Sequence, residues 1–435
     1  MNNRRQFMHA IGQSAAIAAA SQAILAATAG PNDRLRVGLI GPGGMGSSHL
    51  RQLGEQQDVE IAYVCDVDAE RLAAAARTAE EMTGRRPEAV TDLRRVLDDK
   101  SVEAVWIATP DHWHAPATIL ALDAGKHVYV EKPCCHNVRE GRLMIEAARR
   151  NNRVVQVGTQ SRSAPHVLSA MERLRSGAIG EVLVAKAWNS QLRGNIGRAE
   201  PTEPPAGLDF DLWLGPAPQT AYRKTLLHGI WRWWYDFGVG DIGNDGVHDI
   251  DLAWWGLGVE THPSRVVALG GKYFFDDDQQ FPDTQQIVYE YPTAHNGRPK
   301  QLVFEQRIWS PYKLHGYENG AAFFGTEGYL ILGHSHGYQL YGPRDKLVES
   351  VDGSPNLLDH HRNFIDCVRN GGRPNADIEI GHRSATLCHL ANIATRVGRA
   401  LTFDPDQEQI VADEAANALL HRQYREGHWA VPKGV

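Results

Sequence analysis

The sequence predicts an α/β fold in two parts, an N-terminal, doubly wound parallel sheet and a C-terminal α/β domain with a large, mostly antiparallel open sheet. From residue 34 to residue 158, short apolar runs alternate with helical segments, as expected for strands that are buried on both faces. Beyond residue 180 the apolar runs are longer, and several alternate with period two, as in strands with one solvated face. The chain has 435 residues, 42% of them apolar and 22% charged, which suits two or three globular domains.

Residues 1–29 are predicted to be an export signal that is not part of the fold. They contain no Asp or Glu, include the pair Arg4-Arg5, and continue in an alanine-rich stretch from Ala10 to Ala27. Paired arginines before a weakly apolar segment are typical of a twin-arginine (Tat) signal peptide, and Ala27-Thr28-Ala29 fits a small-x-small cleavage site. The alternative is a membrane anchor, but alanine drives insertion poorly and polar residues interrupt the stretch. We expect cleavage after about Ala29, a periplasmic or otherwise exported location, the Tat export machinery as a partner, and no membrane association of the mature chain.

Charge and cysteine content exclude two broad classes of protein. The 45 Lys and Arg against 52 Asp and Glu give a net charge of −7, so no nucleic-acid partner is expected. Five cysteines are an odd number in a long chain, which argues against a disulfide framework. We interpret the adjacent Cys134 and Cys135 as small packing residues.

The first apolar run leads into a glycine-rich loop with the spacing of a dinucleotide site. Residues 34–40 are predicted to form a buried strand, and Gly41-Pro42-Gly43-Gly44-Met45-Gly46 then fits G-x-G-x-x-G before a helix at 47–53. A second strand at 59–65 ends at Asp66, 20 residues beyond the last glycine. Glycines let the backbone approach a pyrophosphate, the helix N-terminus stabilises its charge, and Asp66 would accept hydrogen bonds from the adenosine ribose. Because a carboxylate repels a 2′-phosphate, NAD is expected in preference to NADP.

The alternation then continues through the rest of the predicted parallel sheet. Helices are expected at 69–82, 95–99 and 115–124, and strands at 104–108, 126–130 and 154–158. Two of these strands run into polar loops, Thr109-Pro110-Asp111-His112-Trp113-His114 and Glu131-Lys132-Pro133. Doubly wound sheets place their ligand-contacting loops after the carboxyl ends of strands, so both loops are candidate binding segments.

The pattern changes after residue 155, where we place a domain boundary. A helix is expected at 165–176, a long strand at 181–191, and further strands at 265–274, 284–292, 301–308, 319–324 and 328–333. Residues 192–210 are rich in Gly and Pro and are predicted to form a loop over the site. The predicted organisation is a signal at 1–29, a nucleotide-binding domain at 30–155, and a substrate and oligomerisation domain at 156–435.

These motifs resemble the glucose-fructose oxidoreductase / inositol dehydrogenase / MocA (Gfo/Idh/MocA) family of sugar and polyol oxidoreductases. The resemblance rests on GPGGMG, on Asp66, on TPDHWHA at 109–115 and on AGKHVYVEKP at 124–133. It extends to the segments 240–258 and 360–390. The resemblance implies a Rossmann domain, a tightly bound NAD, a sugar or polyol substrate, and a homo-oligomer.

The resemblance also implies where the cofactor lies. The lysine of the EKP element sits between nicotinamide and sugar in the family, which gives that position to Lys132, although a lysine after a strand can equally be a solvated surface residue. A lysine beside a cationic nicotinamide can relay a proton as hydride leaves. His112 has the alternative role of capping the following helix. The expected cofactor contacts are Gly41, Pro42, Gly43, Gly44, Met45, Gly46, Asp66, Thr109, Pro110, His112, His114, Glu131, Lys132 and Gln160.

Substrate contacts are expected from Lys132, Arg162, Trp231, Asn244 and His248. Bulky aromatic rings stack on sugar faces, and of the tryptophans at 231, 233, 234, 254 and 255 the first is the best candidate, the others being packing residues. Asn244 and His248 are four apart at the opening of a helix, so both are expected to face the same direction.

The predicted catalytic residues are Lys132, His248 and Asn244. The usual family pattern has Asp where this chain has Asn244, and an amide cannot take a proton, so His248 is the expected base or Lys132 acts alone. The acids and histidine between Asp241 and Asp251 are dense enough to suggest a metal site, but hydride transfer needs no metal and none is expected.

Three functions are weighed on this basis. The first is an exported NAD-dependent oxidoreductase that acts on a sugar, sugar derivative or cyclitol and recycles a bound cofactor, since no free NAD pool exists outside the cytoplasm. The second is an NAD-dependent glycosidase that oxidises transiently, eliminates the aglycone and returns the hydride. Residues 240–258 lack the Tyr-Pro-Thr-His element of the best-known glycosidase branch. The third is a non-catalytic carbohydrate-binding protein, which would not need Lys132.

Overall fold

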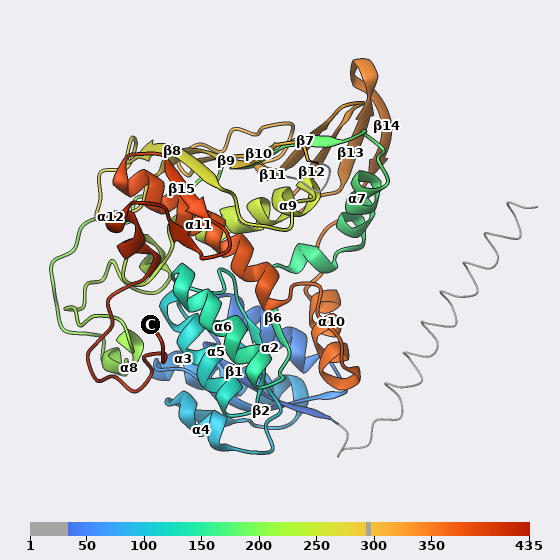
Figure 1. The fold of residues 1–435 in the computed structure, drawn as a ribbon. Helices are drawn as coiled ribbons and strands as arrows, with labels where there is room; N and C mark the ends of the chain where they lie inside the picture. Colours follow the sequence, from blue (N-terminus) through green and yellow to red (C-terminus); the bar gives the residue numbers. More distant parts are fainter. Residues whose placement is uncertain (1–33, 293–296) are drawn as a thin grey trace, which may run out of the picture.

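A computed structural model describes residues 34–292 and 297–435, which form two sheets lying one above the other (Figure 1). A parallel sheet with its helices occupies the lower half of the view, and a larger sheet occupies the upper half. The predicted export signal and its cleavage site fall within residues 1–33, outside the described residues. Within the described ranges, the helices lack the combination of length and apolar character needed to cross a bilayer.

The lower sheet has six parallel strands in the order β3-β2-β1-β4-β5-β6. This confirms the doubly wound sheet, and it places the switch of winding direction between β1 and β4, where such sheets bind ligands. The strands are β1 Leu35–Ile40, β2 Val59–Cys65, β3 Glu88–Val90, β4 Ala104–Ile107, β5 His127–Val130 and β6 Val155–Val157. The helices are α2 Met45–Gly54, α3 Ala69–Thr83, α4 Leu93–Asp98, α5 Asp111–Asp123 and α6 Val138–Arg150.

Two features of this half differ from the sequence prediction. β3 is a short edge strand with two exposed residues, which is too little pattern to identify from sequence. α5 begins at Asp111 and not at residue 115, so the polar motif after β4 forms the first turn of a helix. Pro110 precedes this turn and Asp111 lies within it, both of which favour a helix N-terminus.

The upper sheet has ten strands in the order β14-β13-β12-β11-β7-β10-β9-β8-β15-β16. Its strand pairs are antiparallel except for β7 with β10, which confirms the predicted open sheet. Its first strands are β7 Val182–Asn189, β8 Arg265–Gly271, β9 Thr284–Tyr291, β10 Lys300–Arg307 and β11 Asn319–Gly325. The others are β12 Tyr329–Gly333, β13 Tyr338–Gly342, β14 Lys346–Val351, β15 Leu401–Asp404 and β16 Gln409–Ile410, and the last four of these were not predicted.

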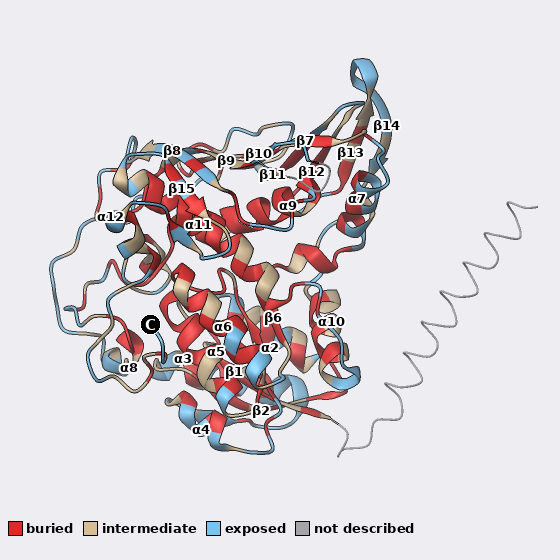
Figure 2. Ribbon diagram, in the orientation of Figure 1, coloured by how far each residue is buried: buried red, intermediate tan, exposed pale blue. Residues whose placement is uncertain are grey.

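Helices fill the space between the two sheets (Figure 2). α9 (Val247–Leu257) and α11 (Ile378–Val397) are almost entirely buried against the large sheet, and α11 also packs on α6 of the lower half. α10 (Leu357–Asn370) inserts Phe364 and Ile365 among the buried residues of β1 and β2. The chain therefore returns to the parallel sheet after building the antiparallel one. The remaining helices are α7 Pro165–Arg175, α8 Phe210–Leu214 and α12 Glu414–Asn417.

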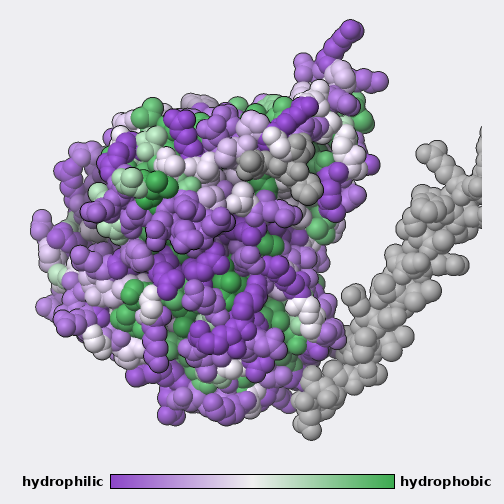
Figure 3. All heavy atoms as spheres, in the orientation of Figure 1, coloured by the Kyte–Doolittle hydropathy of each residue, from purple (hydrophilic) through white to green (hydrophobic). Residues whose placement is uncertain are grey.

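The surface and the cysteines agree with the composition. Hydrophilic side chains cover most of the face drawn in Figure 3, with apolar residues in small patches. The five cysteines are free and buried, which confirms Cys134 and Cys135 as packing residues. Cys135 Sγ lies 3.7 Å from Nε2 of His389 on α11, so this pair belongs to the contact between the two halves.

Candidate functional site

A pocket opens at the carboxyl ends of β1, β2 and β4, beside the switch in winding direction. It contains about 1280 Å³ of empty space, including the solvent at its mouth, which is enough for a dinucleotide and a small ligand. Residues from the segment 208–232 and Trp429 from the C-terminal tail line it opposite the sheet. Of the loop predicted over the site, residues 192–210, only Leu208 lines the pocket, and the other covering residues of this segment lie between 212 and 232.

The glycine-rich loop has the geometry of an anion cradle. A Cβ at Gly46 would lie 2.0 Å from the Gly41 carbonyl oxygen, and one at Gly41 would lie 2.8 Å from the backbone of Ala108, so side chains are excluded there. Gly44 has φ +46° and faces open space, since a Cβ added there would have no neighbouring atom within 4 Å. α2 begins at the next residue without a side-chain cap. The Gly46 and Ser47 amides donate to the Gly43 and Gly44 oxygens at 2.8 and 3.1 Å, which shapes the loop, and the positive end of the helix faces an anionic group placed there. These residues fit a dinucleotide pyrophosphate.

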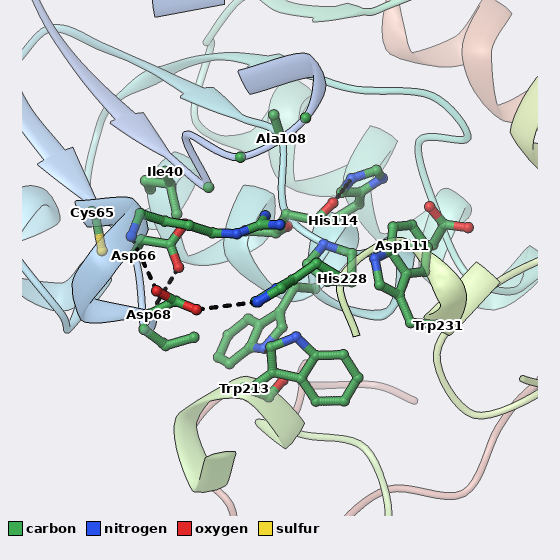
Figure 4. Close-up of a pocket in the computed structure, with 18 of the residues that line it drawn as sticks. Ile40, Cys65, Asp66, Asp68, Ala108, Asp111, His114, Trp213, His228 and Trp231 are labelled. Atoms are coloured by element: carbon green, nitrogen blue, oxygen red, sulfur yellow. Dashed lines mark hydrogen bonds and ion pairs between the residues drawn. The ribbon is translucent and has the colours of Figure 1, made fainter. Parts of the chain in front are cut away.

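Asp66 lies at the end of β2 and faces the pocket (Figure 4). Its Oδ1 accepts a hydrogen bond of 2.9 Å from the Asp68 amide, and burial raises the pKa of Asp66 to about 6. His228 points toward this side of the pocket, with Nε2 3.3 Å from Asp68 Oδ2. The Arg71 guanidinium from α3 lies against Gly43 and places a positive charge beside the cradle.

The EKP loop brings Lys132 into the same pocket as the glycine loop. Lys132 Nζ donates a hydrogen bond of 2.7 Å to the backbone oxygen of Asn244. Behind it, the buried Glu131 accepts hydrogen bonds from His49 Nε2 at 2.9 Å and from Gln160 Nε2 at 3.0 Å. Burial opposes ionisation of Glu131, but the His49 hydrogen bond, with the charges nearby, holds its pKa below the ordinary value. Gln160 therefore supports Glu131, and it is not among the residues lining the pocket.

The two histidines of the motif after β4 have different positions. His114 lines the pocket and joins two loops, with Nδ1 2.7 Å from the Pro133 oxygen and Nε2 2.9 Å from the Thr109 oxygen. Burial lowers the pKa of His114, so its neutral ring donates to one of these oxygens at a time. His112 is fully buried, with Nε2 2.9 Å from the Trp213 oxygen, and does not line the pocket. The expected cofactor contact of His112 is replaced by a packing role.

Asn244 lines the pocket and His248 does not, although the sequence predicted both residues in the site. Asn244 belongs to a π-helical turn, Ile242–Gly246, which precedes α9 and changes the angular spacing of side chains. Asn244 lines the pocket, whereas His248 lies in the first turn of α9 behind it, with its ring centroid 4.8 Å from that of His334. Burial, and then the neighbouring His334, lower the pKa of His248 well below its ordinary value, so the ring is neutral.

Two expected sugar contacts are also occupied by protein groups. Arg162 is buried and forms two hydrogen bonds with Asp251, at 2.7 and 2.8 Å, away from the pocket lining. Sequence cannot show this pairing, because the partner lies 89 residues further along the chain. Trp231 does line the pocket, but its ring is mostly buried and lies 4.3 Å from the Arg232 guanidinium carbon.

The predicted site residues fall into two groups by their position relative to the pocket. Twelve of them line the pocket: Gly41, Gly43, Gly44, Met45, Asp66, Thr109, Pro110, His114, Glu131, Lys132, Trp231 and Asn244. Six do not: Pro42, Gly46, His112, Gln160, Arg162 and His248.

Sequence reasoning missed two groups beside Lys132. Arg232 lines the pocket, and its Nε donates a hydrogen bond of 2.7 Å to Asn244 Oδ1. His334, from the turn after β12, has Nδ1 3.0 Å from Oδ1 of the buried Asp249. Burial raises the pKa of Asp249 to about 7. Arg232 stood within the predicted tryptophan cluster and could have been singled out, but His334 belongs to no motif.

One group of described residues has donor atoms spaced for a metal ion. The ligand atoms of His262, His382 and Glu408 lie within 4.8 Å of one another, away from the pocket. Glu408 already accepts hydrogen bonds from Arg142 at 2.6 and 3.0 Å and contacts the Nε2 atoms of His262 and His382 at 3.0 and 2.6 Å. The contacts of Glu408 with Arg142, His262 and His382 form an ion-paired cluster, called the clamp below, which ties α6 and α11 to the turn before β16.

Comparisons with known proteins agree with the fold and with the pocket. Residues 35–159 match the profile described as "Oxidoreductase family, NAD-binding Rossmann fold". Residues 182–298 and 326–431 match the profile of the "Oxidoreductase family, C-terminal alpha/beta domain". Together the two matches span the parallel sheet and the larger sheet except for β10 and β11.

Individual relatives are more distant. A glycosyl hydrolase family 109 protein of Shewanella pealeana is 29% identical over 206 residues, which is 42% of this chain and less than half, 45%, of that protein. An inositol 2-dehydrogenase of Saccharopolyspora erythraea is 32% identical over 345 residues, 77% of this chain and 82% of that protein. A levoglucosan dehydrogenase solved with NADH and levoglucosan superposes with a TM-score of 0.65 at 22% identity, covering 85% of this chain and 99% of that one.

Proposed function

Because the chain belongs to the Gfo/Idh/MocA oxidoreductase family, we propose that it is an NAD-dependent oxidoreductase that acts on a ring carbon of a sugar, sugar derivative or cyclitol. One observation carries the proposal: Lys132 of the EKP element reaches the pocket that the glycine loop and Asp66 also line. A site that only bound carbohydrate would not need an ammonium group beside a dinucleotide cradle.

Each part of the pocket has its own role in this reaction. The α2 N-terminus and glycine loop would hold the pyrophosphate, Asp66 the adenosine ribose, and the bound nicotinamide would supply a hydride acceptor. The substrate hydroxyl must lose a proton as its carbon loses hydride. Lys132 is placed to relay that proton, because its Nζ lies in the pocket, fixed by the Asn244 oxygen: the ammonium group would pass one of its protons to a neighbouring base as it receives the one from the hydroxyl, and so stay positively charged.

His248, whose pKa is lowered by burial and then by the charges of His334 and Lys132, is the proposed next acceptor of the proton. His248 is neutral and can accept a proton, and its ring contacts His334, which pairs with Asp249. Burial opposes the charged form of His334, but Asp249 outweighs this effect and raises its pKa. Asn244 orients Lys132 and Arg232 and transfers no proton.

We also propose export by the twin-arginine route, from the pattern of residues 1–29, and retention of NAD after export. Replacing Arg4 and Arg5 with Lys should leave the protein in the cytoplasm, as measured by fractionation of cells that express the full chain. Unchanged periplasmic delivery of the Lys-Lys variant would refute the assignment. The homo-oligomer implied by the resemblance stays a prediction.

Product analysis tests the proposed reaction. The purified protein is incubated with free sugars and with aryl glycosides, and the products are identified by mass spectrometry. Ketone or lactone products formed from free sugars support the oxidoreductase. Release of the aglycone, with intact sugar and no net NADH, would contradict it and identify a glycosidase.

A further inference from the structure

Two cations meet at the inner end of the pocket without a carboxylate partner. Lys132 Nζ donates to the backbone oxygen of Asn244, while Arg232 donates through Nε to Asn244 Oδ1 at 2.7 Å and through Nη1 to the Gly229 oxygen at 3.0 Å. All three acceptors are neutral. Within residues 34–292 and 297–435, neither Lys132 nor Arg232 forms an ion pair.

The acids nearest to these cations are already engaged. Arg193 donates to Asp241 Oδ1 at 3.2 Å and to Asp245 Oδ2 at 2.6 Å. Asp111 also lines the pocket, but burial raises its pKa to about 7 against the opposing charges of Arg232 and Lys132, so it carries only part of a charge near neutrality. Glu131 also lines the pocket, but it is held by His49 and Gln160, so none of these acids pairs with the side chain of Lys132 or Arg232.

Asn244 helps to keep Arg232 without a carboxylate partner. Its Nδ2 donates to Asp241 Oδ1 at 3.1 Å, which orients the amide so that Oδ1 faces Arg232. A carboxylate at this position would neutralise Arg232 and repel Asp241. The amide instead holds the guanidinium in place and leaves its charge available.

Arg232 also presents a free edge. Trp231 covers one part of the guanidinium, Nε and Nη1 are hydrogen-bonded, and Nη2 has no protein partner in the described residues. Burial lowers the pKa of Arg232, as for a charge withdrawn from water without a full counter-charge. A planar guanidinium edge matches a carboxylate, which can accept hydrogen bonds from it at both oxygens.

We propose that Arg232 and Lys132 form a carboxylate subsite, so that the natural substrate is a sugar acid, a ring that bears a carboxylate, in preference to a neutral sugar or cyclitol. The inference rests on the proposed function. The oxidised nicotinamide would add a third positive charge to this end of the pocket, and the substrate carboxylate would offset it.

Matched ligand pairs test the subsite by binding alone. Isothermal titration of the purified, nucleotide-loaded protein compares glucuronate with glucose, and galacturonate with galactose. Wild type should bind the acids about 10- to 100-fold more tightly, the range expected for charge-assisted hydrogen bonds. This preference should weaken as salt is added, because screening acts on the carboxylate and not on the neutral sugar.

Two variants locate the effect. Arg232→Gln should lose most of the preference for the acids, measured as the ratio of acid to neutral-sugar affinity, and Arg232→Lys should retain part of it. Asn244→Asp adds a negative charge with little change in shape and should also reduce acid binding. Bound nucleotide and melting temperature, measured for each variant, separate a lost subsite from a lost fold.

The outcomes distinguish the subsite from the reaction. Equal binding of acids and neutral sugars, unchanged in both Arg232→Gln and Asn244→Asp, would overturn the subsite. Turnover of neutral sugars that depends on Lys132 and not on Arg232 would overturn it too, and would leave the oxidoreductase proposal standing. Arg232-dependent binding of acids with no hydride transfer would support the subsite and contradict the proposed function.

Discussion

The two ends of the pocket are built in different ways. The core of the cofactor end comes from one stretch of chain, Gly41–Asp66. It depends mainly on backbone shape, since a Cβ at Gly41 or Gly46 would lie 2.0–2.8 Å from neighbouring backbone atoms. The substrate end is assembled from Lys132, Arg232 and Asn244, which lie on three separate segments and are joined by side-chain hydrogen bonds. The first end is specified by local spacing, and the second only by the completed fold.

Lys132→Met gives the largest expected change and acts at the substrate end alone. Turnover should fall by about 10²–10⁴-fold, the range for loss of a general acid or base. Bound NAD should remain, since glycine backbone and Asp66 supply the cofactor contacts at the other end. Steady-state kinetics together with nucleotide content per protein checks both parts. Near-wild-type turnover would remove Lys132 from the mechanism.

Gly46→Ala tests the opposite end. Its Cβ would lie 2.0 Å from the Gly41 oxygen, and overpacking of this kind costs about 1–3 kcal/mol. NAD retention should fall by about tenfold to a hundredfold, the same free energy expressed as an affinity. Gly194→Ala is the matched control, because nothing lies within 4 Å of its Cβ. If Gly46→Ala kept its nucleotide as wild type does, the cradle would be wrongly placed.

Asp66→Asn should produce a smaller change, in cofactor choice. Removing the carboxylate relieves its repulsion of a 2′-phosphate, and Arg71 stands close enough to the cradle to accept one. The ratio of NAD to NADP affinity should fall by about tenfold, the value of one charged hydrogen bond. Competitive titration of the nucleotide-free protein with both cofactors measures this ratio, and an unchanged ratio would exclude Asp66 as the selective group.

Glu408→Gln should leave the pocket unaffected and change stability only. The clamp is strongest when Glu408 is ionised, and although burial opposes that form, His262, His382 and Arg142 lower its pKa. A lowered carboxyl pKa gives stability that is present above the unfolded value of 4.5 and is lost as pH falls. Burial lowers the pKa of His382, but Cys135 and Glu408 outweigh this effect and raise it. The stability that protonated His382 contributes is therefore present below pH 6.5 and is lost as pH rises.

The corresponding measurement is the melting temperature between pH 3 and pH 9. The difference in melting temperature between wild type and Glu408→Gln should be largest in the mildly acidic window where both contributions overlap, and the substitution should cost about 3 kcal/mol there, as for a broken buried pair. Turnover under folding conditions should match wild type. A profile of unchanged shape would show that the clamp does not set the acid limit of stability.

The same contrast explains what the sequence could predict. Both sheets, the glycine loop and Asp66 were predictable because a strand, a turn and a helix follow one another within about thirty residues. Arg162 was misassigned because its partner Asp251 is distant in sequence and no local pattern reveals the pair. His248 was expected in the site because it lies four residues after Asn244, but it does not line the pocket and its ring packs against that of His334.

The central claim is that a resident NAD and a sugar meet in this pocket, and the redox state of the bound nucleotide tests it most directly. The purified protein is denatured for mass spectrometry of its nucleotide, and a second sample is mixed with uronic acids and neutral sugars while the NADH absorbance band is followed. The account predicts NAD(H) as the released nucleotide and reduction of the bound cofactor by a sugar in wild type, strongly slowed in Lys132→Met. Release of NADP(H) or of no nucleotide, or a band that stays unchanged with every sugar of the panel, would contradict it.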